Sequence, residues 1–75
     1  EKRTRAIKIS RKLALLLARD ASLELADRVE AAGLGVDADN IRRSTKIFFR
    51  RGDSTMLQSN IETAEMILTG AYGRR

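Results

Sequence analysis

The sequence predicts an all-α domain of three to four short helices, with a basic arm at its N-terminus. Three observations favour this class: proline is absent, apolar residues recur at helical spacing, and most glycines follow an apolar helical stretch. A chain of 75 residues accommodates one small domain. With 43% apolar residues it is not wholly disordered, and no apolar run is long enough to span a membrane. We divide the chain into a basic arm (1–9), a single helical domain (10–70) and a basic tail (71–75).

The basic arm contains Ile7 and Ile9, which alternate with polar neighbours. This pattern is typical of a short strand or of a flexible tail. A strand that pairs with its twin in a dimer gives a ribbon-helix-helix arrangement, in which a β-ribbon lies in the major groove of DNA. A flexible arm reaches instead into an adjacent minor groove. The long stretch up to residue 32 argues against the ribbon-helix-helix interpretation, which needs a compact first helix.

Residues 10–32 carry apolar side chains on two faces of a helical wheel. Three leucines near the start share one face, whereas Leu25 and Val29 lie on another, rotated by about a third of a turn or more. A single straight helix with this pattern is buried on both sides, as in a dimer, or it breaks. Residues 20–22, Asp-Ala-Ser, offer a break because their polar side chains can cap a new helix. We therefore expect two helices, at 10–19 and 22–32.

The next two segments each predict one helix, at about 40–51 and 54–69. In the first of them, Ile41 and Phe48 fall on the apolar side and the cationic residues fall on the opposite side. Glycines follow the helical stretches, where a left-handed residue ends a helix, and short polar residues stand where the next helix begins. The expected caps are Asp37, Asp39 or Asn40 for one helix and Asp53 or Ser54 for the other.

The net charge of +5 is arranged in blocks along the chain. Residues 1–19 carry +6, residues 20–40 carry −5, residues 41–51 carry +5 and the remainder carries −1. Two basic blocks are typical of a protein that binds a polyanion such as nucleic acid. Two other interpretations exist. In the first, the basic blocks pair with the acidic block, within one chain or across a dimer. In the second, the basic blocks are ordinary solvated faces. Surface ion pairs contribute only about 0–1 kcal/mol, so we favour phosphate binding.

The two helices that flank Gly33 and Gly35 resemble a helix-turn-helix motif, in which the second helix enters the major groove. The predicted connection, from Gly33 to Asn40, is longer than the usual turn of about 3–4 residues, so a plain helical hairpin is the alternative. In the motif, arginine reads guanine and asparagine reads adenine through paired hydrogen bonds. The expected nucleic-acid contacts are Arg3, Arg5, Lys8, Asn40, Arg42, Arg43, Lys46 and Arg50.

Cysteine and histidine are both absent, which removes several classes of chemistry. The chain has no disulfide framework, none of the usual nitrogen or sulfur ligands of zinc, and no histidine for acid–base or nucleophilic catalysis. A glycine-rich phosphate loop is also absent. We therefore expect no enzyme activity, no catalytic residue, no cofactor, no metal and no small-molecule substrate.

These observations predict a small dimeric DNA-binding domain of a transcriptional or plasmid-maintenance regulator, located in the cytoplasm at the nucleoid. RNA is the alternative nucleic-acid partner because it carries the same phosphate charge. No membrane partner is expected, since the acidic block disfavours a cationic membrane-surface helix. The alternative function is a helical protein–protein interaction or dimerisation module with no nucleic-acid role.

Overall fold

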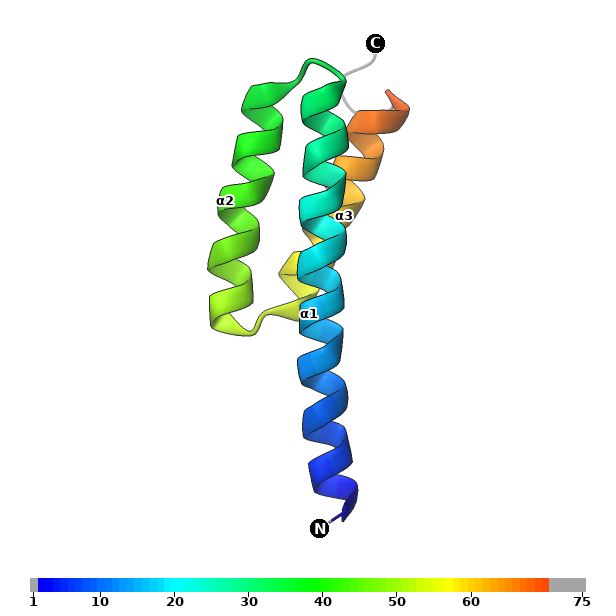
Figure 1. Ribbon diagram of the computed structural model, residues 1–75, viewed down its shortest axis with the longest axis vertical. Coiled ribbons are helices and arrows are strands. Elements are labelled where there is room, and N and C mark those ends of the chain that lie inside the picture. Colours follow the sequence, from blue (N-terminus) through cyan, green and yellow to red (C-terminus); the bar gives the residue numbers. More distant parts are fainter. Residues whose placement is uncertain (1, 71–75) are drawn as a thin grey trace.

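The computed structural model describes the backbone of residues 2–70 and the side chains of residues 10–70. Within this range the backbone forms three helices and no strand: α1 (Lys2–Ala31), α2 (Gly35–Arg51) and α3 (Ser54–Thr69). α2 runs back beside α1, and α3 then returns in the direction of α1 (Figure 1). The all-α prediction is therefore confirmed. The predicted basic tail, 71–75, lies outside the described residues.

α1 is one continuous helix, so the predicted break at residues 20–22 is wrong. Ser22 does not cap a new helix, because its side chain is fully buried and bonds to Thr45. Asp20 instead pairs with its neighbour Arg19 at 3.1 Å. Residues 2–9 are helical too, so the short strand, one of the two alternatives for the arm, is wrong and no β-ribbon forms from these residues. This segment contains no glycine or proline to stop a helix that is already nucleated.

Left-handed glycines end the helices, as the sequence predicts. Gly33, Gly52 and Gly70 have φ values of 89°, 71° and 79°, a region that other residues rarely adopt. Asp53 caps α3 as predicted, since its carboxylate accepts a hydrogen bond from the backbone N–H of Met56 at 3.1 Å.

The predicted start of the helix at 40–51 is wrong. α2 begins at Gly35 rather than near Asn40, and no side chain caps it. The backbone N–H of Ala38 already donates to the carbonyl of Leu34, so the helix forms without a polar cap. The connection between α1 and α2 is therefore limited to residues 32–34.

Alanine supplies three of the six buried apolar residues of the described chain. Ala26, Ala38 and Ala64, one from each helix, are fully buried and pack in one cluster with Val29 and Ile41. Alanine at the contact positions lets the helix axes approach closely, but it buries little apolar area per residue. The three helices therefore enclose a narrow core, with Leu25, Ile67 and Leu68 packed at its edge.

A buried polar group joins all three helices beside this core. Thr45 on α2 donates its hydroxyl proton to the carbonyl of Ile41 at 2.6 Å. Ser22 on α1 lies 2.7 Å from the same hydroxyl, and Asn60 on α3 donates to it at 3.4 Å. A hydroxyl carries a single proton, so Ser22 is the donor in its bond to Thr45. Every buried side-chain nitrogen or oxygen in the described region has a hydrogen-bond partner.

α1 is much longer than the helices that cover it. At about 1.5 Å per residue, its 30 residues span about 45 Å, whereas the 17 residues of α2 span about 25 Å. The N-terminal part of α1 therefore projects past the ends of α2 and α3 (Figure 1). The molecule measures 51 × 20 × 16 Å as a result. None of the described helices is long and apolar enough to cross a membrane.

Candidate nucleic-acid interface

α2 presents a cationic surface on the side that faces away from the core. Ala38, Ile41 and Thr45 are its buried residues, so helical spacing places the next set of residues on the opposite side. This set is exposed, and we call it the α2 outer face: Asn40, Arg43, Ile47, Arg50 and Arg51. Lys46 is also exposed and lies at the edge of this face, next to α1.

Arg42 lies on the flank of α2 that faces α1 and is tied to carboxylates. Its guanidinium binds Asp27 at 2.8 Å and Glu30 on α1, and Asp39 on α2 at 3.2 Å. The hydrogen bonds that Arg42 donates to Asp27 and, to a smaller extent, to Glu30 raise the pKa of Arg42 further above its ordinary range. Arg42 therefore joins α1 to α2, and its donors are engaged within the chain.

The other cations of α2 are free of such pairs. Among residues 10–70, the ion pairs of α2 all involve Arg42, whereas Arg43, Lys46, Arg50 and Arg51 pair with no carboxylate. The interpretation in which the basic and acidic blocks neutralise each other within one chain thus accounts for Arg42 and leaves the rest of the α2 block uncompensated.

A groove with a volume of about 440 Å³ runs between α1 and α2. Leu23 and Phe49 supply apolar lining, and Lys46 lies along it with Arg19. The guanidinium of Arg19 lies 4.7 Å from the centre of the Phe49 ring, a distance typical of a cation–π contact. One face of Phe49 is thus covered, which argues against this ring as a platform for stacked bases.

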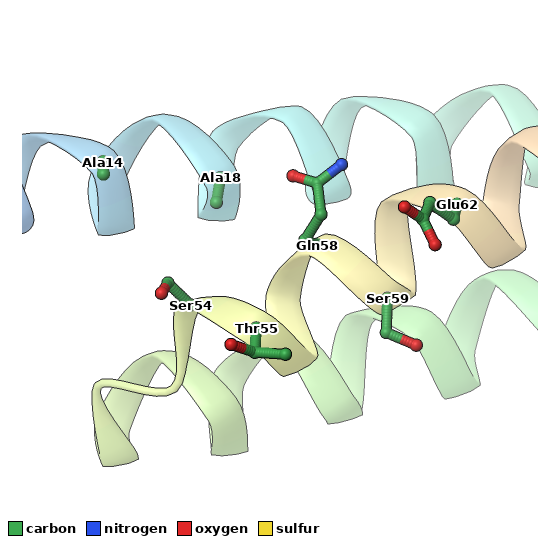
Figure 2. A pocket seen from close by; sticks show the side chains of 7 residues that line it. All are labelled: Ala14, Ala18, Ser54, Thr55, Gln58, Ser59 and Glu62. Carbon is green, nitrogen blue, oxygen red and sulfur yellow. The ribbon is translucent and has the colours of Figure 1, made fainter.

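A second groove, of about 510 Å³, lies between α1 and the start of α3 (Figure 2). Ala14 and Ala18 form the α1 side, and four uncharged polar residues together with Glu62 form the α3 side. Its one charged residue is a carboxylate, so this groove does not suit a polyanion. No group of three or more potential ligands for a metal occurs among the described residues.

The sequence-predicted site residues fall into three sets. Asn40, Arg43, Lys46 and Arg50 lie together on α2 and are exposed, whereas Arg42 is held by carboxylates. The side chains of the third set, Arg3, Arg5 and Lys8, lie outside the described residues, although their backbone belongs to α1.

One exposed cation of the same face was missed by the sequence reasoning. Arg51 follows Ile47 by four residues, the spacing that places two side chains on one side of a helix. That spacing could have identified it.

The arrangement of α1 and α2 is that of a helical hairpin. The two helices lie side by side along most of α2 (Figure 1), joined by residues 32–34. A helix-turn-helix instead crosses its helices at about 90–120°, so that the second helix stands clear of the first. Here α1 lies along one side of α2, and the outer face of α2 is open to a partner.

No protein-family model, curated protein sequence or solved structure matches this chain.

Proposed function

We propose that this domain binds duplex DNA through the α2 outer face. The observation that supports the proposal is the set of cations on one side of α2 that no carboxylate of the described chain neutralises. Arg43, Lys46 and Arg50 are the proposed phosphate contacts, with Arg51 beside them. Each neutralised phosphate releases a condensed counterion, so binding of this kind weakens as salt rises.

Asn40 gives this face a group that can do more than bind phosphate. It is exposed one turn before Arg43, and its side-chain amide carries both a donor and an acceptor. Asparagine pairs with adenine through two hydrogen bonds in the major groove. We assign phosphate binding to the cations and any base contact to Asn40.

Arg42 has a structural role in this proposal. Its contacts with Asp27 and Glu30 fix the rotation of α2 against α1 and thereby keep the other cations facing outward. The regulatory role, the nucleoid location and the contacts of Arg3, Arg5 and Lys8 stay predictions.

A titration of duplex DNA at several salt concentrations tests the proposal. The variants are Arg43→Gln, Lys46→Gln and Arg50→Gln, and each is expected to weaken binding and to reduce the slope of log K against log salt by about 0.9. Arg28→Gln is the matched control, because Arg28 is an exposed arginine of α1 with only a 3.9 Å contact to Glu24. The control should bind like the parent chain.

Two outcomes would contradict the proposal. One is the absence of salt-dependent binding by the parent chain at low ionic strength. The other is a loss in Arg28→Gln equal to that in the α2 variants, which would indicate only a diffuse effect of net charge. A parallel titration with duplex RNA identifies the partner, since tighter binding to RNA would reassign the surface to that nucleic acid.

A further inference from the structure

α1 has a second face that nothing in the described chain covers. Leu13 and Leu17 are 53% and 68% exposed, although both are large apolar residues. Helical spacing places Asp20 and Glu24 on the same side, opposite the buried Ser22. We call the four exposed residues, Leu13, Leu17, Asp20 and Glu24, the α1 back face.

The length of α1 also indicates that this helix packs against a partner. α1 has 30 residues, 13 more than the 17 of α2, and its N-terminal part projects past the ends of α2 and α3 (Figure 1). A helix of about 12 residues without tertiary contacts is marginal in water, because helical stability in proteins comes mostly from packing. A partner surface that packs against the α1 back face and continues along the N-terminal part of α1 would bury the exposed leucines and would stabilise the projecting part of the helix.

The charges along α1 indicate which surface this is. Residues 3–10 carry three cations and no anion, and residues 20–27 carry three anions and no cation. The two segments lie at equal distances on either side of the Leu13–Leu17 pair. The pattern is therefore complementary to itself when one α1 is laid antiparallel on another, and it repels itself when the two run parallel.

We propose that a second copy of this chain binds the α1 back face in an antiparallel arrangement. Leu13 packs on the partner's Leu17 and the reverse, as the two-fold symmetry of such a dimer requires. Segment 3–10 then lies along the partner's segment 20–27. The contact runs along about 40 Å of helix, at about 1.5 Å per residue.

This dimer gives the basic start of α1 a task other than phosphate binding. In this arrangement the positive charge of segment 3–10 lies beside the negative charge of the partner's segment 20–27, so it is offset without nucleic acid. The α2 outer face points away from the core on a different helix and stays open in the dimer. The dimer proposal and the DNA-binding proposal therefore concern different surfaces, and each can be tested independently of the other.

Sedimentation equilibrium of the intact chain tests the association. The parent chain is expected to be a dimer, and Leu17→Glu is expected to be a monomer, because it places a carboxylate in the apolar centre of the contact. Val36→Glu is the matched control, since Val36 is 78% exposed on α2 and outside the proposed interface. A monomeric parent chain, or a Leu17→Glu variant that stays dimeric, would overturn the proposal.

Disulfide trapping tests the orientation, and the chain suits it because it has no cysteine of its own. Antiparallel pairing about the two leucines brings Ser10 beside the partner's Asp20. Ser10→Cys mixed with Asp20→Cys is therefore expected to cross-link rapidly, and Ser10→Cys alone is expected to cross-link slowly. Rapid cross-linking of Ser10→Cys with itself would indicate parallel helices and would overturn the antiparallel assignment.

Discussion

Thr45 shows how much of this small fold depends on one hydroxyl group. It accepts hydrogen bonds from Ser22 on α1 and Asn60 on α3, and it donates to the carbonyl of Ile41 on its own helix. Thr45 is 1% exposed and Ser22 is fully buried. A buried donor that loses its acceptor is costly, so this group favours one rotation and one register of the helices over others.

Substitutions at this group are expected to be strongly coupled. Thr45→Val removes the acceptor of two donors and should lower the free energy of unfolding by about 1–3 kcal/mol, and Ser22→Ala should have a smaller effect, of about 0.5–1.5 kcal/mol. The double variant should be more stable than the sum of the single effects allows, because no unpaired hydroxyl remains on α1 or α2. Urea unfolding of the four chains as a double-mutant cycle measures this coupling, and additive effects would contradict it.

Substitution of Arg42 is expected to change the melting temperature, whereas the same substitution of its neighbour Arg43 is not. Arg42→Gln removes the contacts to Asp27 and Glu30, so it should lower the melting temperature, and the deficit relative to the parent chain should shrink as salt is added. Arg43→Gln removes no described ion pair and should leave the melting temperature unchanged. Thermal unfolding followed by circular dichroism at low and high salt compares the two, and equal losses would contradict the assignment. Because the pKa of Arg42 is raised, its guanidinium stays charged up to strong alkali, so an increase of pH from neutral to moderately alkaline values should not remove this contribution.

At the scale of single residues, sequence reasoning succeeded with glycine and failed with buried polar groups. A glycine after a helical stretch has few roles, and Gly33, Gly52 and Gly70 all adopt the expected left-handed conformation. Ser22 reads equally well as a helix cap or as a buried donor. Its actual role depends on Thr45, 23 residues further along the chain, so no local pattern could reveal it.

The junction between α2 and α3 is the best-specified boundary between elements. Gly52 ends α2 with φ at 71°, and Asp53 caps the first turn of α3. Both signals are local, which explains why the bounds of α3 were predicted well. The start of α2 carries no such signal, since Leu34 precedes it and provides no side-chain bond.

Removal of the α3 cap is expected to destabilise the bundle by a defined amount. Asp53→Ala leaves the N–H of Met56 without its acceptor and should lower the free energy of unfolding by about 0.5–2 kcal/mol. Asp53→Asn keeps an oxygen in the same place and is the control, with an expected loss well below that of alanine. Chemical unfolding measures both, and an equal loss in the two variants would indicate that the capping bond contributes little.

The continuity of α1 could not be predicted from the sequence pattern of this helix alone. Two apolar faces on one stretch are compatible with a break or with a helix that is covered on both sides, and only tertiary structure decides between them. The bundle buries Ala26 and Val29 on one face and leaves Leu13 and Leu17 exposed on the other. The second alternative, a straight helix with a partner on each side, is therefore the one that the dimer proposal develops.

For the whole molecule, the distribution of charge matters more than its sum. The acidic part of α1 takes up Arg42 and leaves the α2 outer face positive, whereas the basic start of α1 extends past the bundle. Sequence reasoning located both basic blocks. It could not show which cations would be paired, because Arg42 meets Asp27 and Glu30 only after the helices pack.

The dimer proposal predicts a stability that depends on protein concentration. Association that favours the folded state raises the melting temperature as concentration increases. The parent chain and Val36→Glu should show this rise, and Leu17→Glu should not. Thermal unfolding across a broad range of concentrations checks the prediction, and a melting temperature independent of concentration in the parent chain would contradict it.

The most direct test of the central claim, that the α2 outer face binds duplex DNA, is a titration of the isotope-labelled chain followed by NMR. The amide signals of Asn40, Arg43, Ile47 and Arg50 are expected to shift first and furthest as DNA is added at low salt, and to return as salt is raised. The signals of α3, which carries no cation from Ser54 to Thr69, are expected to stay in place. Shifts centred on α3, or no shift along α2 at low salt, would contradict the claim.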